Sequence, residues 1–122
     1  MNRTYWKILS AATLLCGMLA ARAFPGLAPQ EQWVHLTAKK FEYSPTSITV
    51  KRGHPVAIEI VSLDRRHGFV VPGLAQRVDV KPGQTNVVRF TPETAGTFPF
   101  HCDVFCGGGH EGMEGTLVVT DE

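Results

Sequence analysis

Short β-rich runs alternate with turn signals from residue 33 onward, and no stretch keeps a helical period over the ten or so residues that a helix needs. Turn pairs such as Ser44-Pro45, Pro72-Gly73 and Pro82-Gly83 separate the runs. We expect strands over residues 33–41, 47–53, 55–63, 67–73, 77–83, 85–92, 96–102 and 115–121. Many short strands at near-regular spacing are typical of a β-sandwich of about a hundred residues. The sequence therefore predicts an all-β sandwich with one small core.

The first residues have the pattern of an export signal. Arg3 and Lys7 precede an uncharged, largely apolar run over residues 8–21, and Ala21-Arg22-Ala23 supplies a cleavage site. We expect a signal peptide over residues 1–23 and a single domain over 24–122, with its core at about 33–121. The alternative is an uncleaved segment that tethers the domain to a membrane, although a membrane helix needs roughly 20 apolar residues.

Export changes how the remaining cysteines are interpreted. Cleavage would remove Cys16 and leave Cys102 and Cys106 in a periplasmic or otherwise oxidising location, with Met113 as the remaining methionine. The mature chain would carry nine Lys and Arg against eleven Asp and Glu and no basic stripe, which excludes a nucleic-acid partner. We expect this mature form to be soluble.

Four side chains with metal-binding atoms recur between Cys102 and Met113. They follow the spacing Cys102-x3-Cys106-x3-His110-x2-Met113, and Gly107-Gly108-Gly109 lets the segment fold tightly. A loop between two strands lies at one end of a sandwich, where binding residues concentrate. His67, between two apolar segments, is the candidate for one more nitrogen ligand.

Three chemistries are open to these residues. A Cys102–Cys106 disulfide is favoured by export and by the even cysteine count. Zinc could take both cysteines with His67 and His110 as a tetrahedral set. Copper could use the same four and also Met113, because a soft thioether suits copper and has little use for zinc. The methionine three residues after a candidate histidine favours copper.

Strand alternation separates His101 from the other candidates. Phe98, Phe100 and Cys102 share one parity, so a strand that buries the two rings also turns Cys102 inward and His101 outward. His101 is thus the weaker ligand candidate. Asp64 is expected to serve a turn, with a hydrogen bond toward the His67 segment as the alternative.

The run CDVFCGGGHEGM, with LDRRHGFVVPGL, RVDVKPGQTN and GTFPFHC before it, resembles the dinuclear-copper (CuA) cupredoxin domain of cytochrome c oxidase subunit II, which also occurs in nitrous oxide reductase. The resemblance covers about residues 41–120 and implies a cupredoxin-like Greek-key sandwich. It departs from the oxidase domain at Phe69, where that domain is rich in tryptophan, and at Val104, which lacks a carboxylate. These departures concern the docking surface rather than the metal ligands.

Carried onto this sequence, the resemblance implies two copper ions per chain, bridged by the thiolates of Cys102 and Cys106. His67 and His110 would each bind one ion, Met113 would be a weak ligand to one, and the backbone carbonyl of Val104 a weak ligand to the other.

This ligand set predicts an electron carrier and not an enzyme, because six ligands on two ions leave no position for a substrate. The expected partners are redox proteins such as a cytochrome or a membrane oxidase. An alternative function with the same ligands is copper delivery or buffering, in which the partner is a copper chaperone. A zinc-bound or metal-free structural domain is the third possibility.

Overall fold

The computed structural model describes residue 26 and residues 29–121, and the predicted signal peptide over 1–23 lies outside this part. The elements, in chain order, are β1 (Gln32–Lys39), β2 (Glu42–Ser44), β3 (Ser47–Lys51), β4 (Val56–Ser62), β5 (His67–Val71), the 3-10 turn η1 (Pro72–Leu74), β6 (Gln76–Val80), β7 (Asn86–Phe90), β8 (Gly96–His101), the 3-10 turn η2 (His110–Gly112) and β9 (Glu114–Thr120). None of the helices among the described residues has the length and apolar character needed to cross a membrane.

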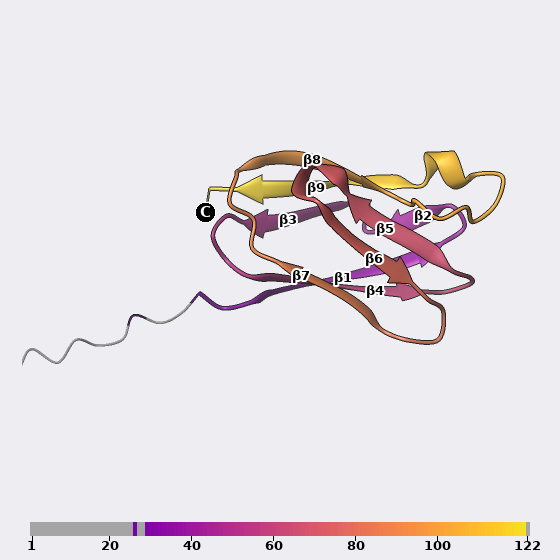
Figure 1. The fold of residues 1–122 in the computed structure, drawn as a ribbon, viewed down its shortest axis with the longest axis horizontal. Coiled ribbons are helices and arrows are strands. Elements are labelled where there is room, and N and C mark those ends of the chain that lie inside the picture. Colours follow the sequence, from indigo (N-terminus) through magenta and orange to yellow (C-terminus); the bar gives the residue numbers. More distant parts are fainter. Residues whose placement is uncertain (1–25, 27–28, 122) are drawn as a thin grey trace, which may run out of the picture.

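The strands form two sheets that face each other, so the predicted all-β sandwich is confirmed (Figure 1). One sheet has the order β2-β1-β4-β7 and the other the order β3-β9-β8-β5-β6. Both sheets are mixed, because β1 runs parallel to β4 and β3 runs parallel to β9. Each expected strand is present, although usually shorter than predicted.

Strand β2 was not predicted. The chain turns at Lys40 and Phe41 and returns antiparallel to β1, with Thr37 opposite Ser44. The sequence hides this turn, because Lys40 and Phe41 are not turn residues and continue the β-rich run. The predicted strand over 33–41 therefore ends two residues too late, and Tyr43 enters the core from β2.

An aromatic cluster fills the centre of the core. Tyr43, Phe69 and Phe100 are each 1% exposed or less, and the Phe69 and Phe100 ring centroids lie 4.9 Å apart. The Tyr43 ring meets the Phe100 ring edge-on at 5.2 Å. Each such ring pair adds about 0.5–1.5 kcal/mol beyond the burial of its area. The cluster supports β5, which begins at His67, and β8, which precedes Cys102 and Cys106.

The connections between β1 and β2, β4 and β5, and β8 and β9 lie at one end of the sandwich, and the C-terminus lies at the other (Figure 1). Three segments far apart in the sequence therefore meet at one end, and this end carries the predicted metal ligands.

Candidate metal centre

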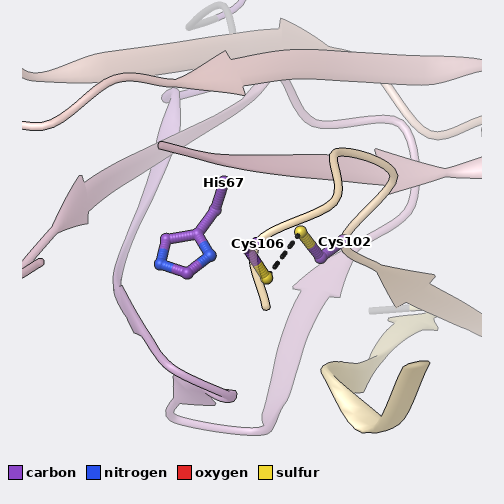
Figure 2. A group of neighbouring side chains, drawn as sticks. All are labelled: His67, Cys102 and Cys106. Atoms are coloured by element: carbon purple, nitrogen blue, oxygen red, sulfur yellow. Dashed lines mark hydrogen bonds between the residues drawn. The ribbon is translucent and has the colours of Figure 1, made fainter. Parts of the chain in front are cut away.

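Three predicted ligands meet at the loop end of the sandwich. His67 begins β5, while Cys102 and Cys106 follow β8, and the nitrogen and sulfur atoms that they offer lie within 4.8 Å of one another. All three side chains are buried, with His67 and Cys106 at 0% exposure. The His67 ring is turned toward the two sulfur atoms (Figure 2). Pairing between β5 and β8, at Val70 and His101, brings His67 close to Cys102, although these two residues are 35 positions apart in the chain.

The two cysteines are thiols and do not form a disulfide. Their sulfur atoms are 3.7 Å apart, whereas a disulfide bond is about 2.05 Å long. Both sulfurs thus remain available to a metal ion, and the disulfide alternative does not describe this structure.

His67 presents one nitrogen to the site and keeps the other for a carboxylate. Its Nε2 lies 2.7 Å from Oδ1 of Asp64, and because an ionised carboxylate only accepts hydrogen bonds, Nε2 carries the proton. Nδ1 is buried and has no hydrogen-bond partner among the described residues. An unpaired buried polar atom is costly unless something binds it. Nδ1 therefore has a free lone pair beside two thiols, which is what a metal ligand requires.

Asp64 is held as a carboxylate. Burial raises its pKa, but hydrogen bonds from His67 and from the backbone N–H groups of Lys40 and Arg65 outweigh that effect and lower the pKa to about 2. The two backbone bonds are 2.7 and 2.6 Å long. Asp64 thus orients the His67 ring, in the manner of the carboxylate partners that metal-binding histidines commonly have. Of the two roles considered for Asp64, the hydrogen bond to the His67 segment is confirmed.

The other three candidates surround the same two sulfurs. Nδ1 of His110 lies 3.6 Å and Sδ of Met113 lies 3.8 Å from Sγ of Cys106, and the thiol of Cys102 donates to the carbonyl of Val104 at 3.1 Å. Met113 is fully buried, whereas His110 is partly exposed. The structure therefore brings all six predicted residues together.

Phe41 explains why the loop is rich in glycine. A Cβ atom on Gly109 would overlap the Phe41 ring, and one on Gly107 would lie 2.9 Å from two of its carbons. Gly107 also has a φ of 139°, a backbone conformation that residues with a Cβ atom rarely adopt. The loop can thus lie flat on Phe41 and keep His110 beside Cys106. The glycine run predicted a tight loop, but the sequence did not identify Phe41 as its support.

Tyr43 and Gly68 link the site to the core. The Tyr43 hydroxyl donates to the carbonyl of Gly68 at 2.6 Å, and the N–H of Gly68 donates to Sγ of Cys102 at 3.3 Å. These two bonds connect the core to a ligand sulfur.

The hydroxyl and thiol groups around the site hold their protons tightly. Burial raises the pKa of Tyr43 far above its usual value, and the nearby Cys102 and Cys106 raise it further, so the Tyr43 hydroxyl stays a donor. Burial and the hydrogen bond with Cys102 raise the pKa of Cys106 to about 11. A metal ion that binds Cys106 at neutral pH must therefore displace a proton.

His101 points away from this group, as strand parity predicted. Its side chain is exposed, while Phe100 and Cys102 on either side are buried. We expect His101→Ala to leave the copper content and the main absorption bands unchanged, measured by metal analysis and visible spectroscopy. His110→Ala is the matched comparison, because it removes a histidine that contacts Cys106. Loss of a copper equivalent in His101→Ala would contradict the parity argument.

The donor set of this site favours copper over zinc. Two thiols and a buried thioether are soft ligands, and imidazole suits copper as well. A tetrahedral zinc ion would be satisfied by the cysteines and histidines and would leave Met113 without a role.

The model of the cupredoxin-like domain family matches residues 8–119. The chain belongs to the cupredoxin family. Its sheets and buried sulfur and imidazole donors agree with this assignment, and the copper site includes His67, Cys102, Cys106 and Met113.

Among its relatives, this cupredoxin is 37% identical over 101 residues to cytochrome c oxidase subunit 2 of Thermus thermophilus, covering 83% of this chain and 75% of that protein. It is 32% identical over 90 residues to nitrous-oxide reductase of Pseudomonas fluorescens, covering 70% of this chain but only 14% of that enzyme. A chain of a heme-copper terminal oxidase dimer superimposes with a TM-score of 0.66 at 28% identity, covering 73% of this cupredoxin and 65% of that chain. The resemblance to the copper domains of oxidase subunit II and nitrous oxide reductase is thus confirmed.

Proposed function

We propose that this cupredoxin holds a dinuclear copper centre of the CuA type and carries single electrons between redox proteins outside the cytoplasm. The observation that carries the proposal is the pair of buried thiols 3.7 Å apart, each with its own set of neighbours. Cys102 lies beside the Val104 carbonyl, and Cys106 lies beside His110 and Met113. Two sulfurs with donors on both sides suit two ions that share both thiolates.

A copper pair held by Cys102, Cys106 and the neighbouring donors would supply one-electron transfer, with the charge shared by both ions. The residues of the chain keep the donors fixed. Asp64 holds the His67 ring, Gly68 donates to the Cys102 sulfur, and Phe41 supports the glycine loop. Because donors held by separate strands move little when the charge changes, we expect a low barrier to transfer. We propose no catalysis, since two ions with six ligands leave no position for a substrate.

His110 is the proposed edge for electron passage. It is partly exposed, and the ring of Phe105 lies 5.8 Å from it and is 75% exposed. His67, in contrast, is enclosed. The named relatives are a subunit of cytochrome c oxidase and a nitrous-oxide reductase. The oxidase name supports a cytochrome or a membrane oxidase as the partner, and the export signal expected over residues 1–23 supports an exported location for this chain.

Copper delivery is the second candidate function, favoured by the position of His110 on a glycine-rich loop that opens to solvent. An ion could leave past this residue, with a copper chaperone as the partner. Reversible one-electron cycling without loss of metal would favour electron transfer, whereas rapid transfer of copper to an acceptor protein would favour delivery.

The decisive experiment counts copper per chain and records the EPR spectrum of the copper-loaded protein. We expect two ions per chain and a hyperfine pattern from one electron shared by two copper nuclei. A single ion per chain, or hyperfine structure from one nucleus, would refute the dinuclear centre.

Met113→Leu tests the thioether separately from its packing. Leucine keeps nearly the volume of the fully buried methionine, so unfolding should become easier by less than about 1.5 kcal/mol. We expect two coppers to remain, with a shifted reduction potential and altered hyperfine structure, because a weak ligand influences how evenly the ions share the electron. A potential and an EPR spectrum identical to those of the wild type would show that Met113 only fills the core.

A further inference from the structure

Four charged side chains form a continuous chain of ion pairs on the outside of the sheet beside the site. Arg66 contacts Asp79 at 3.2 Å, and Arg77 contacts the same Asp79 oxygen at 2.9 Å. Arg77 then reaches Asp103 with two nitrogens, Nε and Nη2, one on each carboxylate oxygen. This two-point contact is the strong and directional form of an arginine–carboxylate pair. We call these four residues the ion-pair chain.

The ion-pair chain crosses strand β5 at Gly68. Arg77 and Asp79 belong to β6, at the edge of the sheet, and Asp103 follows β8, so β5 lies between them in the order β8-β5-β6. Gly68 pairs with Asp79 in register, and a Cβ atom on Gly68 would overlap Oδ1 of Asp103. The missing side chain leaves the space through which the Asp103 carboxylate reaches Arg77.

Both ends of the ion-pair chain are joined directly to residues of the metal centre. Arg66 precedes His67, and Asp103 lies between Cys102 and Val104. Under the Asp103 carboxylate, the N–H of Gly68 donates to Sγ of Cys102. A shift of Asp103 would therefore move the Cys102 sulfur relative to β5 and change a hydrogen bond to a ligand atom.

We infer that Asp103 and Arg77 are positioning residues for the copper site, clamping the Cys102–Val104 segment across Gly68 onto β6. Individual exposed ion pairs contribute little to stability, and the Asp103 and Arg77 side chains are 25% and 44% exposed. The effect of the clamp is thus expected on the geometry of the site rather than on global unfolding. The inference rests on the proposed copper function, but its first test needs no metal.

The test uses Asp103→Asn, Arg77→Met and the double variant. Asparagine keeps the shape of the Asp103 side chain and removes its charge. Methionine keeps the aliphatic part of the Arg77 side chain and removes the guanidinium group. Asp121→Asn is the matched control, because it breaks the exposed Arg52–Asp121 pair, 3.0 Å long, at the opposite end of the sandwich. Thermal unfolding is measured alongside to confirm that each variant folds.

In the metal-free protein, both single variants should speed hydrogen exchange at the Gly68 amide, while Asp121→Asn should not. In the copper-loaded protein, Asp103→Asn and Arg77→Met should each release copper to a chelator about tenfold faster than the wild type. Each should also have a shifted reduction potential, because both variants lose a residue that orients a ligand. The double variant should match the single ones, because each change breaks the same contact. Arg77→Lys should bring the exchange rate, the copper release and the potential only part of the way back to the wild-type values. Lysine keeps the positive charge but cannot bind both carboxylate oxygens as the guanidinium group does.

Wild-type exchange at Gly68 together with wild-type copper release in Asp103→Asn and Arg77→Met would overturn the clamp. So would additive effects in the double variant. A wild-type protein that binds no copper would instead refute the proposed function, and the exchange measurement on metal-free protein would still decide on the clamp.

Discussion

Cys102→Ser is expected to reduce the copper content to one ion per chain and to produce the spectrum of a mononuclear site. The reason is the arrangement around Cys106, whose sulfur lies 3.6 Å from Nδ1 of His110 and 3.8 Å from Sδ of Met113, with His67 in the same cluster. One cysteine, two histidines and a methionine are the ligand set of blue-copper sites. Metal analysis, visible absorption and EPR spectra would measure the change.

Cys106→Ser is the matched comparison, because it removes the other thiol. Cys102 would then keep His67 and the Val104 carbonyl, whereas the contacts with Nδ1 of His110 and Sδ of Met113 are made by the sulfur of Cys106. We therefore expect Cys106→Ser to bind copper more weakly than Cys102→Ser and to lack an intense blue band. Two coppers retained in Cys102→Ser with an unchanged spectrum would contradict the dinuclear centre.

His67→Ala should abolish tight copper binding, and added imidazole should not restore it. The side chain is 0% exposed, so its removal opens an enclosed cavity that solvent-borne imidazole cannot readily enter. Loss of the buried ring and of its bond to Asp64 should also lower the free energy of unfolding by about 2 kcal/mol. Titration with copper in the presence and absence of imidazole, with denaturant unfolding alongside, would measure both effects.

The comparison is His110→Ala, which removes the partly exposed histidine. Imidazole can reach this position from solvent, so we expect it to restore copper binding to His110→Ala. Equal rescue of both variants would show that the two histidines do not differ in enclosure, and that the proposed direction of electron passage through His110 has no structural basis.

Strand alternation was visible in the sequence and predicted the strands and the facing of their side chains. Phe98, Phe100 and Cys102 share a parity, and the structure turns Phe100 and Cys102 inward and His101 outward. Such predictions hold because the facing of a side chain depends only on its neighbours along one strand. Strand β2 was not predicted, because the chain turns at Lys40 and Phe41, and neither is a residue type that commonly forms turns.

The ligand types were also visible locally. Cys102, Cys106, His110 and Met113 fall within twelve residues, and their spacing around three glycines predicted one soft metal site. The sequence could not decide between a disulfide and two thiols, because the distance between two sulfurs depends on how the loop folds. Packing of Phe41 on Gly107 and Gly109 sets that fold, and the sulfurs come to rest 3.7 Å apart.

By itself, the sequence thus determined the all-β fold class, the inward parity of Cys102 and the donor types of the loop, since each of these depends on nearby residues. Only the tertiary structure decided which nitrogen of His67 faces the sulfurs, because that choice depends on Asp64 held by the backbone of Lys40. It also decided that Asp103 reaches Arg77 across Gly68, since this contact needs β8, β5 and β6 side by side. Pairing between distant strands creates such contacts, and no local pattern in the chain records them.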